Sequence, residues 1–136
     1  MPEIQSNKKV LIIDDSEVIR NRLVYLFSEI NGVDVVGQAG NTSEGFELYC
    51  SLNPDVIILD IRMPGESGMN LLKKIKQASP HTIIAILTNY PYSAYRKRCK
   101  ELGADFFFDK STEFEKIKQL FNGGLHHESL QNNVSD

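Results

Sequence analysis

Five polar residues of this chain each stand at the end of an apolar run, and together they could bind a cation and a phosphate. Asp14 and Asp15 follow KVLII, Asp60 follows VIIL, Thr88 ends TIIAILT, and Lys110 follows DFFFD. Three carboxylates in one place repel one another and therefore need a cation, and Mg²⁺ prefers hard oxygen ligands of this kind. We therefore predict Mg²⁺ as the cofactor, with Lys110 as a second positive charge.

A carboxylate placed between a dication and an ammonium group has the surroundings that phosphoryl transfer requires. The cations offset the charge of the incoming phosphoryl oxygens while Asp60 attacks phosphorus to form an acyl phosphate. Thr88 would donate its hydroxyl to a phosphoryl oxygen. Taken singly, these residues have ordinary structural uses as helix caps, strand ends or solvated surface. The prediction therefore depends on their coming together.

The elements that must position these residues alternate between strand and helix. Short branched apolar runs are typical of strands buried on both faces of a parallel sheet, and apolar residues at helical spacing follow each of them. Caps are predicted at Ser16 and Thr42, and Thr112-x-x-Glu115 predicts a capping box for the last helix. We expect strands at 9–14, 33–39, 56–59, 82–88 and 105–109, and helices at 16–30, 42–52, 69–78, 93–102 and from 112 onward.

Five strands, each followed by a helix after a short connection, predict an α/β fold with a doubly wound parallel sheet. In such a sheet all strands point the same way, so the five polar residues should meet at one edge. We expect a flexible segment at 1–7, the folded domain at 8–123 and a flexible polar tail at 124–136.

Composition excludes several classes of protein. The chain has 136 residues, a net charge of −3 and a pI near 5.6, which gives no global nucleic-acid signature. The basic segment Arg96–Lys100 is more typical of a solvated helix face. No apolar run approaches the roughly 18 residues that a membrane span needs, and the first residues lack the apolar core of a signal peptide. We therefore expect no membrane partner, no nucleic-acid partner and a cytoplasmic location.

The motifs Asp14-Asp15, Asp60-x-x-Met63-Pro64-x-x-x-Gly68, Thr88, Gly103-Ala104-Asp105 and Lys110 occur here in one order. Over about residues 8–122 the chain resembles the receiver domains of two-component response regulators, in particular the single-domain, chemotaxis-regulator-like ones. The resemblance implies a flavodoxin-like (βα)5 fold with strand order 2-1-3-4-5.

For the site, the resemblance implies that Asp60 accepts a phosphoryl group from a sensor histidine kinase. It implies that Asp15, Asp60 and the backbone carbonyl of Arg62 bind Mg²⁺, with Asp14 in the outer shell. Such a domain is not an enzyme acting on other molecules; it catalyses only its own phosphorylation and dephosphorylation.

For signalling, the resemblance implies a switch made by Thr88 and Phe107, in which the hydroxyl moves toward the phosphoryl group and the aromatic ring turns inward. The switch would change the face formed by the fourth helix, fifth strand and fifth helix, where an effector protein binds. Arg62 and Tyr90, each two positions after a site residue, would flank the path of a hydrolytic water as a gate.

Three other functions stay open. The domain could be a phosphorelay intermediate without an output of its own. A Mg²⁺-dependent phosphatase of the haloacid dehalogenase class uses similar residues, but it has Asp-x-Asp after its first strand, where this chain has Asp14-Asp15. The third alternative is an interaction module whose acidic cluster is vestigial. Such a module would not need the complete set of Asp14, Asp15, Asp60, Thr88 and Lys110. We expect the output to reach a separate molecule, because no second domain follows the last helix.

Overall fold

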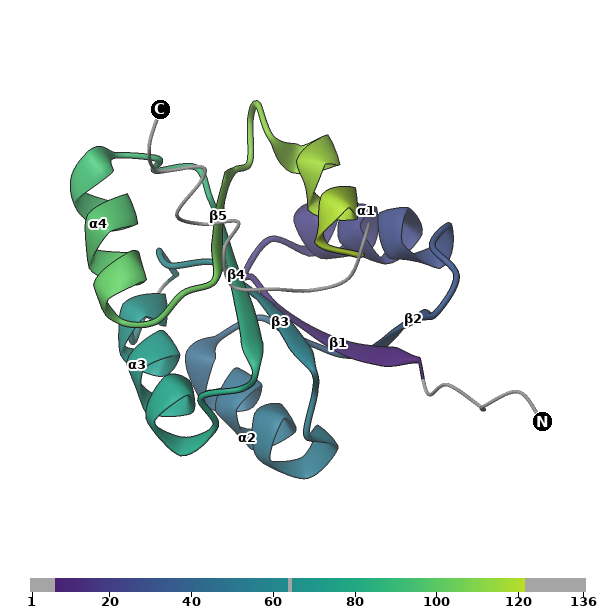
Figure 1. Cartoon of the computed structure of the whole chain (residues 1–136), viewed down its shortest axis with the longest axis horizontal. Helices are drawn as coiled ribbons and strands as arrows, with labels where there is room; N and C mark the ends of the chain where they lie inside the picture. The colour runs from purple at the N-terminus through teal and green to yellow at the C-terminus, as the bar shows by residue number, and fades with distance from the viewer. Residues whose placement is uncertain (1–6, 64, 122–136) are drawn as a thin grey trace.

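The protein is a single parallel sheet with helices on both faces (Figure 1). The computed structural model describes residues 7–63 and 65–121. The strands are arranged in the order β2-β1-β3-β4-β5 and all neighbours are parallel, so the predicted fold class and strand order are confirmed. The strands are β1 (Lys8–Ile13), β2 (Val33–Ala39), β3 (Val56–Leu59), β4 (Ile83–Thr88) and β5 (Phe106–Asp109).

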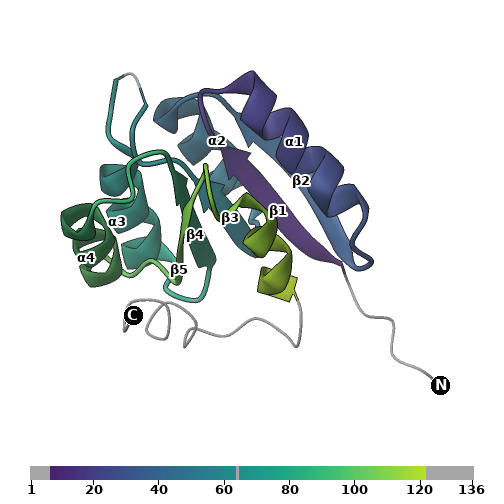
Figure 2. The ribbon, with the colours of Figure 1, turned by 90° about the horizontal axis from the view of Figure 1, so that it is seen from above.

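The helices form two layers around this sheet. As Figures 1 and 2 show, α2, α3 and α4 lie on one face, and α1 and η1 lie on the other. The bounds are α1 (Glu17–Ser28), α2 (Thr42–Leu52), α3 (Gly68–Ala78), α4 (Ser93–Glu101) and the 3₁₀ helix η1 (Phe114–Phe121).

Burial on both faces explains the uninterrupted apolar runs of the central strands. In β1, Leu11 and Ile13 pack in the core under α2 and α3, whereas Val10 and Ile12 pack in the core under α1 and η1. Fully burying each such side chain contributes roughly 1.5–3 kcal/mol before the conformational entropy cost. The two cores hold the strand ends, and hence the polar residues that follow them, in fixed positions.

Two helix starts differ from the sequence prediction. The cap of α2 is Asn41 rather than Thr42, because the Asn41 side chain accepts the Glu44 N–H at 2.8 Å while Glu44 accepts the Gly40 N–H at 3.0 Å. Thr42 is instead buried and donates its hydroxyl to Glu66. The cap of α2 therefore lies one residue nearer the N-terminus than predicted.

The last helix also begins later than predicted, and it is a 3₁₀ helix rather than an α-helix. Asp109 accepts the Ser111 N–H and hydroxyl at 2.9 and 2.7 Å, and its own N–H donates to Glu113 at 2.9 Å. Hydrogen bonds from Ser111 and Thr112 lower the pKa of Asp109. These side-chain contacts occupy the turn in which the Thr112-x-x-Glu115 box would have formed.

The predicted flexible segments, 1–7 and 124–136, lie outside the described residues except for Asn7. The last two residues of the predicted domain, 122 and 123, also lie outside them. Asn7, the first described residue, donates a side-chain hydrogen bond to Asp34 at 3.1 Å. Within the described part of the chain, no helix is long and apolar enough to cross a membrane.

Candidate phosphoacceptor site

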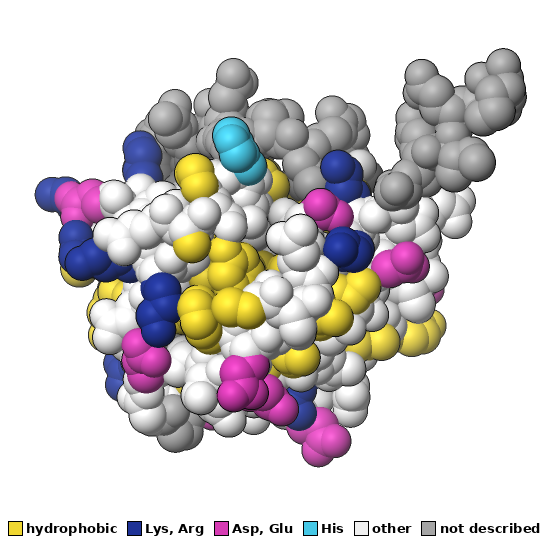
Figure 3. Space-filling view, turned by 90° about the horizontal axis from the view of Figure 1, so that it is seen from below, with side chains coloured by type: hydrophobic (Ala, Val, Ile, Leu, Met, Phe, Trp, Pro, Cys, Tyr) yellow, Lys and Arg dark blue, Asp and Glu magenta, His cyan; other side chains and the backbone are white. Residues whose placement is uncertain are grey.

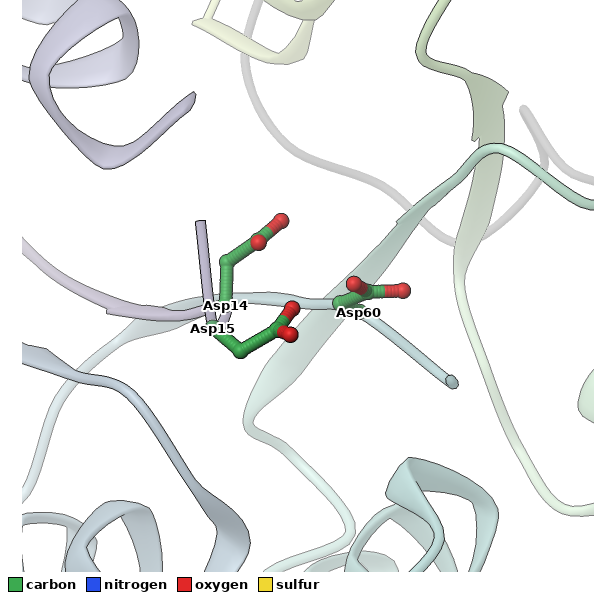
Figure 4. A group of neighbouring side chains, drawn as sticks. All are labelled: Asp14, Asp15 and Asp60. Carbon is green, nitrogen blue, oxygen red and sulfur yellow. The ribbon is translucent and has the colours of Figure 1, made fainter. Parts of the chain in front are cut away.

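Three carboxylates lie together at the carboxyl edge of the sheet. Asp14 and Asp15 follow β1, Asp60 follows β3, and these two strands are paired neighbours with Ile13 opposite Leu59. One oxygen from each carboxylate lies within 4.8 Å of the others. Figure 4 shows the three side chains projecting from adjacent chain segments, with Asp15 extending toward Asp60. Strand pairing therefore brings the predicted acids together.

Lys110 completes this group from the end of β5. Its Nζ lies 2.8 Å from Asp14 Oδ2 and 3.1 Å from Asp60 Oδ2, and all three side chains are buried. Its backbone N–H donates to the Thr88 carbonyl at 2.8 Å, which fixes Lys110 beside the end of β4. Burial alone would lower the pKa of Lys110, but the hydrogen bond to Asp14 and the charges of Asp60 and Asp14 raise it overall. Lys110 is therefore a permanent cation at the site.

The charges around Asp60 favour the binding of another cation. Burial, the largest effect, and the charge of Asp14 raise the pKa of Asp60, although Lys110 and the Arg62 N–H act in the opposite direction. The cluster contains three carboxylates, those of Asp14, Asp15 and Asp60, and the ammonium group of Lys110. When all four side chains are ionised, the cluster therefore has a net negative charge. A hard dication would relieve this excess. The chemistry of the donor set fits Mg²⁺.

The two adjacent acids have different surroundings. Asp14 is buried and uses both oxygens, accepting the Ser16 N–H at 2.8 Å on Oδ1 and Lys110 on Oδ2. Asp15 is exposed, and its carboxylate has no hydrogen bond or ion pair with any described residue. Asp15 is therefore the better placed of the two to ligate a metal directly.

Gly68 allows the loop after Asp60 to close against α3. A Cβ at Gly68 would lie 2.2 Å from the Asp60 carbonyl oxygen and 2.8 Å from the Ile61 Cα, both backbone atoms. The Gly68 N–H donates to the Ile61 carbonyl at 3.2 Å. The sequence identified Gly68 only as the last residue of the motif that begins at Asp60, whereas the structure shows that close backbone contact requires a glycine there.

Comparison with known proteins identifies the family. The response regulator receiver domain profile matches residues 10–122. The chain belongs to the response regulator receiver domain family. The sensory transduction protein LytR of Staphylococcus haemolyticus is 36% identical over 128 residues, covering 93% of this chain and 48% of that protein. A protein-glutamate methylesterase/protein-glutamine glutaminase of Hahella chejuensis is 39% identical over 121 residues, covering 84% of this chain and 31% of that protein.

A solved structure agrees with this assignment. The signal receiver domain of the putative response regulator NarL from Mycobacterium tuberculosis superposes with a TM-score of 0.78 at 28% identity, covering 87% of this chain and 96% of that one. This chain spans about half the length, or less, of the curated relatives quoted above. The family match therefore concerns the receiver part of those longer proteins.

The predicted gate residues of this receiver domain lie in contact with each other. The Arg62 guanidinium carbon is 4.3 Å from the centre of the Tyr90 ring, and Nη1 donates to the Tyr95 hydroxyl at 3.3 Å. The Tyr90 N–H donates to Thr88 Oγ1 at 3.0 Å. Arg62 thus connects the loop after β3 with the loop after β4 and with α4. The contact with Tyr95 had no signal in the sequence, because the two residues are far apart in the chain.

The predicted switch residues are both buried in this receiver domain. Thr88 is fully buried, and Phe107 is 1% exposed in the core under α3 and α4. The Arg96 guanidinium carbon lies 4.6 Å from the centre of the Phe107 ring. The Phe107 ring therefore lies inward in this structure, and its movement on phosphorylation stays a prediction.

Proposed function

We propose that this receiver domain accepts a phosphoryl group on Asp60 from the phosphohistidine of a sensor kinase and signals by binding a partner. The observation that carries the proposal is the contact of Lys110 with both Asp60 and Asp14, beside the further carboxylate of Asp15. A structural carboxylate would need no such surplus of neighbouring acids.

In the proposed reaction, a carboxylate oxygen of Asp60 attacks phosphorus, the phosphorus–nitrogen bond breaks, and the neutral histidine leaves after protonation. Lys110 already donates a hydrogen bond to Asp60 Oδ2. Its ammonium group is therefore placed to stabilise the negative charge of the phosphoryl oxygens once the group is bound to Asp60. Thr88 can turn its hydroxyl, which accepts the Tyr90 N–H, to donate to one of them.

Mg²⁺ would be held by Asp15, Asp60 and the backbone carbonyl of Arg62, with Asp14 in the outer shell, and would neutralise phosphoryl charge. The role of Asp14 follows from its occupied oxygens: the Ser16 N–H and Lys110 already use both of them. Asp14 would therefore orient Lys110 rather than ligate the metal itself.

The output would be a change in the face formed by α4, β5 and η1, which an effector protein reads. The Arg62 contact with Tyr95 supports this proposal, because it joins the phosphoacceptor loop to α4. A phosphorelay intermediate, which passes the group from Asp60 to another histidine, would use the same site. In both cases the domain catalyses only its own phosphorylation and dephosphorylation.

Intact-mass measurement after incubation with acetyl phosphate and Mg²⁺ tests the phosphoacceptor. We expect the mass of one phosphoryl group on the parent and on Asp34→Asn, a control at an exposed acid on β2. Asp60→Asn should gain none. If Asp60→Asn acquires the same hydroxylamine-sensitive adduct as the parent, the phosphoacceptor has been assigned to the wrong residue.

A further inference from the structure

Positive charge is concentrated on two neighbouring helices of an acidic protein. Together α3 and α4 carry seven Lys or Arg residues and one acid. The whole chain has 15 basic and 18 acidic residues, so the remainder carries eight basic and 17 acidic ones. A local charge of +6 therefore lies beside −9 on the rest of the chain. Such an uneven distribution of positive and negative charge attracts charged binding partners as well as affecting solubility.

The two helices form one surface. They lie side by side in Figures 1 and 2, and Gly103, just after α4, lies against the Lys76 side chain of α3. Lys73 is one turn before Lys76 and therefore lies on the same side of α3. In Figure 3 the Lys and Arg side chains are concentrated on the left, the side on which Figure 1 places α3 and α4.

Only part of this charge is neutralised within the domain. Lys76 pairs with Asp105 at 2.8 Å, and Arg98 contacts Glu101 at 3.5 Å. By contrast, the side chains of three exposed lysines have no hydrogen bond or ion pair with any described residue; these are Lys73, Lys97 and Lys100. These three ammonium groups are available to a ligand.

An exposed aromatic residue borders the free lysines. Tyr92, at the N-terminus of α4, is 61% exposed, and its ring lies 5.7 Å from that of Tyr95. Cys99 is the single buried side chain of α4. The outer side of α4 is thus a row of cations with an aromatic residue at one end, without a covering element among the described residues.

We propose that the α3–α4 surface, defined by Lys73, Lys97, Lys100 and Tyr92, binds a short acidic segment of a partner protein. Carboxylates of that segment would pair with the three free ammonium groups, and one apolar side chain of the segment would pack on Tyr92. The inference rests on the proposed function in one respect, that the domain acts by binding a partner.

The charge distribution favours an acidic peptide over a nucleic acid. A polynucleotide is uniformly charged and would extend from the α3–α4 surface onto the acidic remainder of the domain, where it would be repelled. Base stacking also needs open aromatic faces. Arg62 already covers a face of the Tyr90 ring, so Tyr92 is the accessible platform on this surface.

Fluorescence anisotropy with a labelled peptide of Glu and Asp and one central Phe tests the proposal. Lys97→Glu/Lys100→Glu should weaken binding by about tenfold or more, and Tyr92→Ala by a smaller factor. Lys8→Glu/Arg22→Glu is the control, because it changes the net charge equally at exposed basic residues of β1 and α1, outside α3, α4 and the proposed output face. Far-ultraviolet circular dichroism verifies that each variant is folded. A labelled single-stranded RNA is titrated in parallel.

Absence of peptide binding, equal weakening in the two double variants, or tighter binding of the RNA through the same lysines would each overturn the proposal. The peptide is titrated with unmodified and with phosphorylated protein, and intact mass is measured on the same samples. A domain that is phosphorylated but never binds the peptide contradicts this inference alone. A domain that binds the peptide but gains no phosphoryl group contradicts the proposed function alone.

Discussion

Truncating Arg62 or Tyr90 should shorten the lifetime of the phosphoryl group on Asp60. Hydrolysis needs a water molecule in line with the bond to be broken, opposite the carboxylate oxygen of Asp60. Arg62 and Tyr90 lie in contact, with the guanidinium carbon 4.3 Å from the ring centre, and Arg62 also contacts the Tyr95 hydroxyl at 3.3 Å. We expect this arrangement to obstruct the water until Arg62 swings away.

The size of the effect follows from the contacts that hold Arg62. A cation–π contact at an exposed position contributes about 0.5–1 kcal/mol, and a hydrogen bond as long as that to Tyr95 contributes about 0.5 kcal/mol. If water enters only when both are broken, Arg62→Ala should speed hydrolysis roughly five- to tenfold. Tyr90→Ala removes one contact and should speed it about two- to fivefold. The double variant should not exceed Arg62→Ala, because the two residues share one interaction.

The assay loads each variant with acetyl phosphate and Mg²⁺, removes the donor and follows the phosphorylated fraction by intact mass over time. Tyr25→Ala is a matched control, since Tyr25 is 68% exposed on α1 and far from the gate on the other face of the sheet. Parental rates for both Arg62→Ala and Tyr90→Ala would refute the gate. Independent, multiplicative effects in the double variant would refute the shared contact.

Three further predictions concern the site itself. Gly68→Ala should destabilise the domain by about 2–3 kcal/mol in urea unfolding and reduce phosphorylation, because the added Cβ meets backbone. Gly37→Ala is the comparison: the atoms that crowd its Cβ are terminal methyl groups of leucines, so it should cost less, and equal costs would contradict this reasoning. Asp15→Asn should weaken Mg²⁺ binding in a fluorescence or calorimetric titration more than Asp14→Asn, and equal losses would remove the distinction between direct and outer-shell roles. Asp60→Asn should stabilise the metal-free domain at pH 7, because burial raises the pKa of Asp60, and its ionisation as pH rises past the ordinary carboxyl range therefore disfavours the folded state. In urea unfolding the gain should vanish below about pH 3, where this carboxyl is mostly neutral whether folded or unfolded. A gain that persists there would show another cause.

The strands and the convergence of the site were predictable because their causes are encoded locally. Apolar runs such as VIIL identify strands buried on both faces, and parallel strands bring their carboxyl ends to one edge. The start of α1 was also predictable, since Ser16 accepts the Ile19 N–H at 3.2 Å as its cap. The grouping of Asp14, Asp60 and Lys110 follows from strand order, which the family resemblance supplied.

What the sequence did not predict depends on competition between neighbouring groups. Thr112 and Glu115 match a capping box, but Asp109 and Glu113 occupy the same turn with their own hydrogen bonds. The inward position of Phe107 likewise depends on packing beneath Arg96, which no local pattern encodes. Gly68 could be recognised as part of a motif, whereas its close approach to the backbone of Asp60 and Ile61 is visible only in the folded chain.

The buried position of Phe107 bears on how phosphorylation would change the proposed output face. Because the ring already lies in the core, we expect a second connection between Asp60 and α4 to take part in the proposed signal. Arg62 offers one: its N–H donates to Asp60 Oδ1 at 3.1 Å, and its guanidinium contacts the Tyr95 hydroxyl on α4.

If this connection holds α4 in place, the motion that admits water at the gate should also loosen α4, which has Cys99 as its single buried side chain. Arg62→Ala should therefore increase amide hydrogen exchange in Ser93–Glu101 while leaving Glu17–Ser28 in α1 unchanged. Tyr95→Phe, which removes only the hydroxyl, should reproduce part of that increase without changing the Tyr90 contact. Faster phosphate loss in Arg62→Ala with unaltered exchange in α4 would separate the gate from the output, and would place the route from Asp60 to α4 elsewhere.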